Sequence, residues 1–188
     1  MNNYYPNNKG AWRTWLNKNH STKDSIWLIF KKKNSSNPNL TWSEAVDEAL
    51  CFGWIDSTKK SVDSEKYMQY FCKRKPKSNW SKINKEKVKS LIDQGLMEEA
   101  GYRSVEVAKE NGSWNILDKV EALEIPKDLN DEFGNYKGSK EYFESLTKSG
   151  KKILLYWIVS AKRKETRKKR ILEIAENASH KTKPKPFR

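Results

Sequence analysis

The chain has 188 residues, a length that suits one domain or two small ones. Apolar residues make up only 36% of it, but eight Trp, eight Tyr and six Phe can build a core, which excludes a disordered chain. The net charge is +14, and residues 148–188 carry 14 basic against three acidic groups, a net of +11. This asymmetry suggests a polyanionic partner such as nucleic acid, although a solvated, solubilising surface is the simpler explanation.

The two cysteines, Cys51 and Cys72, form no Cys-x-x-Cys pair, and the chain has only two histidines. We therefore expect no metal site, no cofactor and no disulfide. The N-terminus shows no signal peptide, and no apolar run approaches the roughly 20 residues of a membrane helix. These features predict a cytoplasmic protein without a membrane span.

The N-terminal part has the pattern of an α+β unit. Apolar spacing predicts a helix over residues 11–19. Residues 25–33 read as a strand with apolar side chains on both faces, which indicates a strand covered on both sides. A loop is expected over residues 34–39 from their composition.

A helix and a hairpin are expected next. Thr41 and Glu44 fit a capping box, in which each side chain satisfies a free backbone N–H at a helix start. This helix should end at Gly53. Residues 54–60 and 66–73 read as two strands joined by a tight turn, so we expect a small sheet with one helical crossover.

From residue 83 the chain reads as helical. Helical spacing or capping residues indicate helices near residues 84–95, 98–110, 127–133, 139–146, 153–161 and 171–178. The charged stretch between the last two is either part of one long helix or a junction.

The predicted fold class is therefore α+β: a small, mostly antiparallel N-terminal sheet with a crossover helix, packed against a helical C-terminal half. We expect a sheet-containing half over 11–82 and a helical half over 83–178, together forming one compact unit. Residues 1–10 and 179–188 are expected to be disordered tails.

The segment Trp54-Ile55-Asp56-Ser57 is the best indication of a site. Alternation along a strand places Trp54 and Asp56 on one face, where an indole beside a carboxylate suits a ligand ring. The structural alternative, that Asp56 caps or orders the hairpin through a neighbouring Lys or a backbone N–H, is favoured because most polar groups near a core are simply satisfied.

The basic segment after the second hairpin strand is a further candidate. Arg74, Ser78 and Trp80 could bind a phosphate or nucleotide, and the N-terminus of the helix after Ser81 would supply further donors. The alternative is that Ser81 caps this helix and Trp80 packs beside it, and the capping pattern favours that interpretation.

A third candidate lies in the charged stretch near the C-terminus, where seven of ten residues are basic. Such a stretch can neutralise several phosphates, but it accompanies no nucleic-acid recognition motif. A solvated helix face is the favoured alternative. The residues that would contact nucleic acid are Lys162, Arg163, Arg167, Lys168 and Arg170.

Catalytic groups are scarce. His20 lies at a helix end, where it reads as a C-terminal cap. Glu44 and Glu48 are expected on an exposed helix face, and both cysteines in buried, inert positions. We find no catalytic triad or metal cluster in the sequence.

Several stretches together carry a family resemblance: Trp15-Leu16, Asn19-His20, Ile26-Trp27-Leu28, Lys31-Lys32, Thr41 to Ala49, Leu50 to Ser57, Lys77 to Ser81 with Asn84, Tyr156-Trp157-Ile158, Ala161-Lys162, Glu165-Thr166-Arg167 and Arg170-Ile171. On these residues the chain resembles a bacterial family described as YdeI or OmpD-associated, or bacteriocin-protection, proteins. The resemblance covers about residues 11–178. It implies a cytoplasmic protein linked to bacteriocin or envelope stress, with no established reaction, cofactor or catalytic residues. Family members often have a less basic tail, and Pro where Lys164 stands, which would mark a helix junction.

The sequence thus favours a non-catalytic binding module for a small anionic or aromatic ligand, held by Trp54, Asp56, Arg74, Ser78 and Trp80. A first alternative is a nucleic-acid-associated protein that uses the basic C-terminal helices. A second is an unrecognised enzyme with Asp56 as acid or base, for which spacing supplies no second catalytic group.

Overall fold

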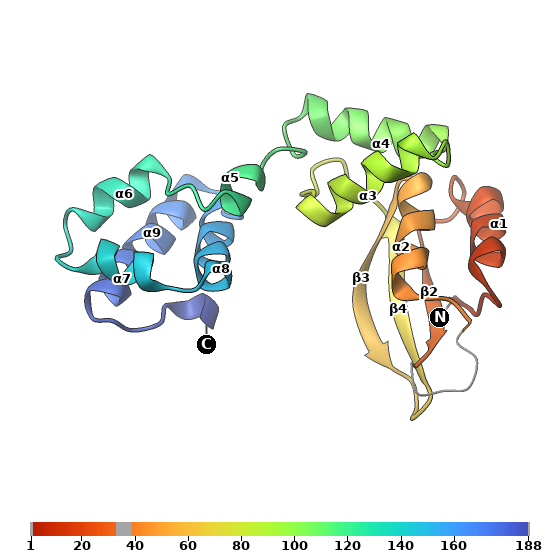
Figure 1. Ribbon diagram of the computed structural model, residues 1–188, viewed down its shortest axis with the longest axis horizontal. Helices are drawn as coiled ribbons and strands as arrows, with labels where there is room; N and C mark the ends of the chain where they lie inside the picture. Colours follow the sequence, from red (N-terminus) through yellow and green to blue (C-terminus); the bar gives the residue numbers. More distant parts are fainter. Residues whose placement is uncertain (1, 33–38, 188) are drawn as a thin grey trace. The chain divides into compact units, whose positions relative to one another are not determined.

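The structure is a computed structural model that describes residues 2–32 and 39–187. Two compact units divide the chain, unit 1 from Met1 to Trp114 and unit 2 from Asn115 to Arg188 (Figure 1). Unit 1 contains a sheet with helices, and unit 2 is helical, so the chain is α+β with a helical C-terminal half, as predicted.

Unit 1 is built on a four-stranded sheet with the strand order β1-β2-β4-β3. β1 runs parallel to β2, and the other neighbours are antiparallel, which confirms the predicted hairpin and crossover. The loop expected over 34–39 lies almost wholly outside the described residues. The elements up to the hairpin are β1 (Asn3–Tyr4), α1 (Lys9–Asn19), β2 (Ser25–Lys31), α2 (Trp42–Cys51), β3 (Trp54–Ser61) and β4 (Lys66–Lys73).

The crossover helix α2 begins and ends as its sequence predicts. Thr41 accepts a hydrogen bond from the backbone N–H of Glu44, whose carboxylate accepts one from the backbone N–H of Thr41. The chain leaves the helix through Gly53, whose φ of +70° is readily available only to glycine. This turn sends the chain directly into β3.

The core of unit 1 is aromatic, as the composition suggested. Trp12, Trp54, Trp80, Phe30 and Phe71 are all less than 2% exposed. Each large ring removes much area from water, so these few side chains compensate for the scarcity of aliphatic residues.

The prediction that β2 is covered on both sides is wrong. Along this strand buried and half-buried residues alternate, and Trp27 and Ile29 lie on the half-buried side. Ile26, Leu28 and Phe30, on the other side, belong to the core. Apolar character on both faces was therefore not a sign of two covering layers.

The helices α3 (Lys82–Asp93) and α4 (Glu99–Glu110) belong to unit 1. Both lie in the segment that the sequence analysis assigned to the helical half. They group with the sheet because Val88, Leu91 and Val105 join the same core as the sheet residues.

Unit 2 consists of short helices around a second apolar core, which includes Leu129, Phe143, Leu154, Ile158 and Ile174. Its charged stretch begins in the break between α8, which ends at Val159, and α9, which begins at Lys164, and it continues into the first turns of α9. Both expected tails contain ordered elements, namely β1 and the final turn η1. The elements of unit 2 are α5 (Asp118–Glu121), α6 (Lys127–Phe133), α7 (Ser139–Ser145), α8 (Lys148–Val159), α9 (Lys164–Ser179) and η1 (Lys185–Phe187).

None of the helices in the described parts of the chain is long and apolar enough to cross a membrane.

Candidate functional site

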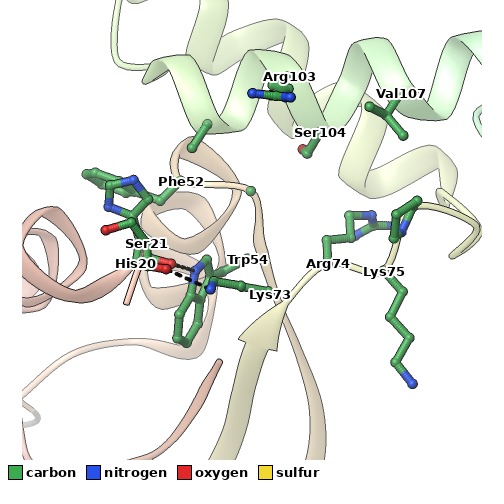
Figure 2. Close-up of a pocket in the computed structure, with 13 residues that line it drawn as sticks. His20, Ser21, Phe52, Trp54, Lys73, Arg74, Lys75, Arg103, Ser104 and Val107 are labelled. Carbon is green, nitrogen blue, oxygen red and sulfur yellow. Dashed lines mark hydrogen bonds between the residues drawn. The ribbon is translucent and has the colours of Figure 1, made fainter. Parts of the chain in front are cut away.

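A cavity of about 560 Å³ lies in unit 1, where four segments meet (Figure 2). Its wall is formed by the turn after α1, the corner between α2 and β3, the end of β4, and α4. Arg103, Ser104 and Val107 line it from α4, and Trp54 and Arg74 line it from the sheet. A cavity of this size suits a small ligand.

Close backbone contact between α4 and the α2–β3 corner shapes this cavity. The backbone N–H of Glu98 donates to the carbonyl of Cys51 at 3.1 Å. A Cβ on Gly101 would lie 2.3 Å from that carbonyl oxygen, and one on Gly53 would lie 2.8 Å from the carbonyl oxygen of Ala100. Glycine at both positions therefore lets the two segments approach.

One side of the cavity is aromatic. Trp54 is buried, and its Nε1 donates to the carbonyl of His20 at 3.3 Å. His20 is the C-terminal cap of α1, as predicted, with its Nδ1 3.0 Å from the carbonyl oxygen of Leu16. Its ring lies 5.1 Å from that of Phe52. The tryptophan indole and the histidine are thus held in place by backbone contacts.

The most unusual group at the cavity is the guanidinium of Arg74. It lies 3.6 Å above the centre of the Trp80 ring, and its Nη2 donates to the carbonyl of Asn79. Its Nε and Nη1 are buried without a hydrogen-bond partner. Burial lowers the pKa of Arg74 to about 10, partly opposed by the negative charge of Asp56, so the group is still a cation at neutral pH.

The cavity has further positive charge. Lys73 donates to the carbonyl of Ser21 and pairs with Asp24 at 3.1 Å. Lys75 and Arg103 are exposed at the rim, and neither forms an ion pair within residues 2–32 and 39–187. Positive groups beside apolar walls favour a ligand that has a negative charge and an apolar or aromatic body.

The structure brings together only some of the residues predicted from the sequence. Trp54 and Arg74 both line the cavity, and Trp80 lies beneath Arg74 without lining it. Asp56 does not line it. Its Oδ2 accepts hydrogen bonds from Trp42 Nε1 at 2.8 Å and Gln69 Nε2 at 2.9 Å. These are structural contacts, but the donors are an indole and an amide rather than the expected lysine or backbone N–H.

The serines near Trp80 also have structural partners. Ser78 donates its hydroxyl to the carbonyl of Lys75 at 2.8 Å. Ser81 caps α3 by accepting from the backbone N–H of Asn84 at 3.2 Å. The capping interpretation of this segment is confirmed, and neither hydroxyl lines the cavity.

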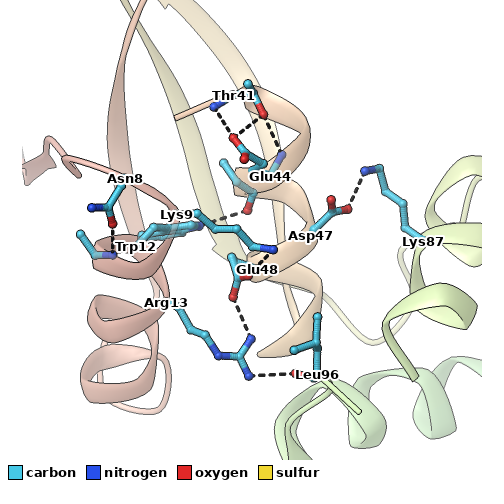
Figure 3. Close-up of polar contacts among 12 residues, drawn as sticks. Asn8, Lys9, Trp12, Arg13, Thr41, Glu44, Asp47, Glu48, Lys87 and Leu96 are labelled. Carbon is cyan, nitrogen blue, oxygen red and sulfur yellow. Dashed lines mark hydrogen bonds and ion pairs between the residues drawn. The ribbon is translucent and has the colours of Figure 1, made fainter. Parts of the chain in front are cut away.

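A buried ionic cluster lies beside the cavity, between α1 and α2 (Figure 3). Glu48 is 1% exposed and pairs with Arg13 at 2.8 Å and Lys9 at 3.3 Å, so its predicted exposure is wrong. Arg13 also contacts Glu98 at 2.6 Å. Burial raises the pKa of the neighbouring Cys51 thiol to about 11, which keeps it unreactive at neutral pH. The cluster ties α1, α2 and the start of α4 together.

The basic stretch in unit 2 is partly occupied by internal contacts. Arg167 holds Asp128 through two hydrogen bonds, of 2.6 and 2.9 Å, and this pairing lowers the pKa of Asp128. Arg170 donates to the carbonyl of Trp157 and to the hydroxyl of Ser160. The other three predicted nucleic-acid contacts are exposed: Lys162, Arg163 and Lys168.

Two family models match different parts of the chain. Residues 4–104, more than half of its length, match a domain of unknown function (DUF8412). The chain belongs to this family. Residues 122–181 match the model described as bacteriocin-protection, YdeI or OmpD-associated, which confirms the predicted resemblance in this region. Comparison with curated proteins and with solved structures finds no match.

The DUF8412 region, residues 4–104, includes nearly all of the cavity wall. Sequence analysis missed Arg103 at this site. No motif surrounds it, and on a helix with several charged residues it reads as solvated. Arg74 was recognised, but nothing in the run from Lys73 to Lys77 shows that it, rather than the lysines, is the buried cation.

Proposed function

We propose that the DUF8412 region binds a small anionic ligand with an apolar or aromatic body, in the cavity beside Arg74. In this proposal the chain is a non-catalytic binding module of the cytoplasm that serves bacteriocin or envelope stress protection. The second part of the proposal derives from the family model matched by residues 122–181.

The uncompensated charge of Arg74 is the observation that carries the proposal. The negative charge of Asp56 acts on the pKa of Arg74, but no ion pair joins the two side chains among the described residues. A buried cation without a partner is destabilising. An anion in the cavity would supply the missing negative charge, and the apolar wall next to Trp54 would cover the rest of the ligand.

Binding is a better-supported proposal than catalysis by Asp56. Both groups that hold Asp56, Trp42 and Gln69, donate to the same carboxylate oxygen, and the carboxylate lies outside the cavity lining. A general acid or base has to reach the atom that it protonates or deprotonates. The geometry therefore gives Asp56 a role in ordering the strands.

A thermal-shift panel tests the proposal. The full chain is melted with inorganic phosphate, aliphatic and aromatic carboxylates, phosphate monoesters and nucleotides. Under the proposal at least one class raises the melting temperature of the native chain, because binding to the folded state stabilises it. The Arg74→Met chain should lose this shift, whereas Lys77→Met, which changes an exposed neighbour outside the cavity, should keep it.

Two results would contradict the proposal. One is the absence of any shift across the whole panel with the native chain. The other is a shift of the same size in Arg74→Met, which would place anion binding elsewhere.

A further inference from the structure

The outer face of the sheet in unit 1 is apolar although it is not part of the core. Trp27 pairs in register with Tyr70, and Ile29 pairs with Met68, so the four side chains lie together on this face. None of them belongs to the hydrophobic core or packs against it. The solvated face of an antiparallel sheet usually carries polar residues, so an apolar one suggests an interaction surface.

The centre of this face is an aromatic pair with a cation above it. The rings of Trp27 and Tyr70 are 5.1 Å apart, centre to centre, at 60° to each other. The Nζ of Lys60, from β3, lies 4.8 Å from the centre of the Trp27 ring. When a flat ligand stacks on the indole, a lysine held in this way can leave the ring and contact a negative group of the ligand instead.

The charge on this face has one sign. Lys31 and Lys66 occupy paired outward positions beyond Ile29 and Met68, and Lys60 lies opposite Met68 on the next strand. None of the outward positions in the described strands carries a carboxylate. An apolar protein partner would gain nothing from these lysines, whereas a polyanion with flat, apolar groups matches both features.

We propose that this outer face binds single-stranded nucleic acid. Bases stack on Trp27 and Tyr70, and backbone phosphates contact Lys60 and Lys66. Single strands are bound in this way when aromatic side chains on a surface accept the bases and basic side chains follow the backbone. A duplex, whose bases are already stacked and paired, does not fit. This site is separate from the cavity at Arg74 and does not depend on the function proposed for that cavity.

Fluorescence anisotropy with the full chain and a labelled oligothymidylate of twelve nucleotides tests the proposal, across a salt series. Trp27→Leu and Tyr70→Leu should each weaken binding about tenfold, because each removes a stacked base. Lys60→Gln should lower the slope of log affinity against log salt by about 0.7, the value for one phosphate contact to a single strand. Trp27→Phe, which keeps a stacking ring, should retain most of the affinity.

Matched controls separate this face from other surfaces. Tyr102→Leu removes an exposed aromatic ring from α4 and should leave binding unchanged. When Arg163 and Lys168 are replaced by acidic residues, Trp27→Leu should still weaken oligonucleotide binding as much as it does in the native chain. Circular dichroism melting of each variant checks that it folds like the native chain.

Three results would overturn the proposal. In the first, Trp27→Leu folds and binds as tightly as the native chain, while charge reversal at Arg163 and Lys168 removes binding, which would move the site to unit 2. In the second, the duplex binds as well as the single strand. In the third, no oligonucleotide binds, and sedimentation shows self-association that Trp27→Leu abolishes, which would make the face a contact between copies of the chain.

Discussion

Arg74 of unit 1 and Arg167 of unit 2 differ in their partners, since only Arg167 is held by a carboxylate. Unit 2 contains the stretch of the sequence with the highest density of positive charge. Within it, Arg167 is held by Asp128 through two hydrogen bonds, and Arg170 donates to a carbonyl and a hydroxyl. In unit 1 a single arginine, Arg74, is buried at a cavity with two nitrogen atoms that have no partner. A high density of positive charge along the sequence therefore does not mean that the charged side chains are free, whereas an arginine outside that stretch can be left without a carboxylate partner.

The unpaired cation lines the cavity that α4 and the α2–β3 corner help to form. The backbone of α4 lies against this corner, where glycine allows close approach, and Arg74 lines the cavity from the end of β4. In unit 2, Arg167 and Arg170 have hydrogen-bond partners on neighbouring elements. The predictions below test this difference, starting with the largest expected effect.

Gly101→Ala should destabilise the chain by roughly 3 kcal/mol or more, because overpacking in a well-packed interior is costly. The new methyl group would lie 2.3 Å from a backbone carbonyl oxygen that has little room to move. Gly10→Ala, in helix α1, is the matched control. Its methyl group would meet only Asn8 at 3.4 Å, so the helix propensity of alanine should stabilise it by up to about 1 kcal/mol. Urea unfolding measures both, and equal effects would contradict the close approach.

Arg13→Met should cost roughly 3 kcal/mol, because it leaves the buried carboxylate of Glu48 with only its weaker partner. Lys9→Met is the comparison: this lysine is 44% exposed and lies farther from Glu48, so its loss should cost less than about 1 kcal/mol. Chemical denaturation at neutral pH measures the difference. A larger loss for Lys9→Met would show that the cluster is not centred on Arg13.

Arg74→Met and Arg167→Met should affect stability with opposite signs in the absence of ligand. Removing the unpaired cation of Arg74 should be neutral or stabilise the chain by up to about 1 kcal/mol, since methionine still covers Trp80. Removing Arg167 breaks a partly exposed double hydrogen bond to Asp128 and should cost about 0.5 to 1 kcal/mol. Melting temperatures of the two variants test this contrast. A clear loss of stability in Arg74→Met would mean that its charge is already compensated.

The smallest expected effect is the acid sensitivity of the Asp128 contact. Its pKa is lowered by the hydrogen bonds from Arg167, so the folded state takes up this proton at lower pH than the unfolded state. The stabilisation is therefore present above the ordinary value of 3.8 and is lost as the pH falls below it. The stability difference between the native chain and Asp128→Asn should be small at pH 6 and should decrease further as the pH falls below 3.8. A difference that grows in acid would contradict this sign.

Much of the fold follows from local sequence signals. The capping box of α2 and the hairpin depend on residues close together in the chain. The junction before Lys164 was left open by the sequence, because lysine at this position gives no helix-breaking signal. The covering of β2 was not predictable, because apolar residues such as Trp27 look the same in sequence whether or not a second layer covers them. The strand β1 is too short to show a period.

The candidate site was predictable only in part. Trp54 and Arg74 were both identified, but Arg103 lies far away in the sequence and meets them only through the packing of α4. Asp56 looked like a site residue because a carboxylate in an apolar strand needs a partner. Its partner Trp42 comes from another element, and only the fold shows the contact.

The proposed anion site distinguishes Arg74, which has no carboxylate partner, from Arg167, which is held by Asp128. The most direct measurement follows the side-chain Nε–H resonances of a ¹⁵N-labelled chain by NMR during titration with phosphate, benzoate and a nucleoside monophosphate. Arg74 is assigned by its absence in Arg74→Met. The account predicts a saturable shift of the Arg74 resonance with at least one of these anions, while the resonance of Arg167, already bound to Asp128, stays in place. An Arg74 resonance that remains fixed throughout, or that moves no more than that of Arg167, would contradict the account.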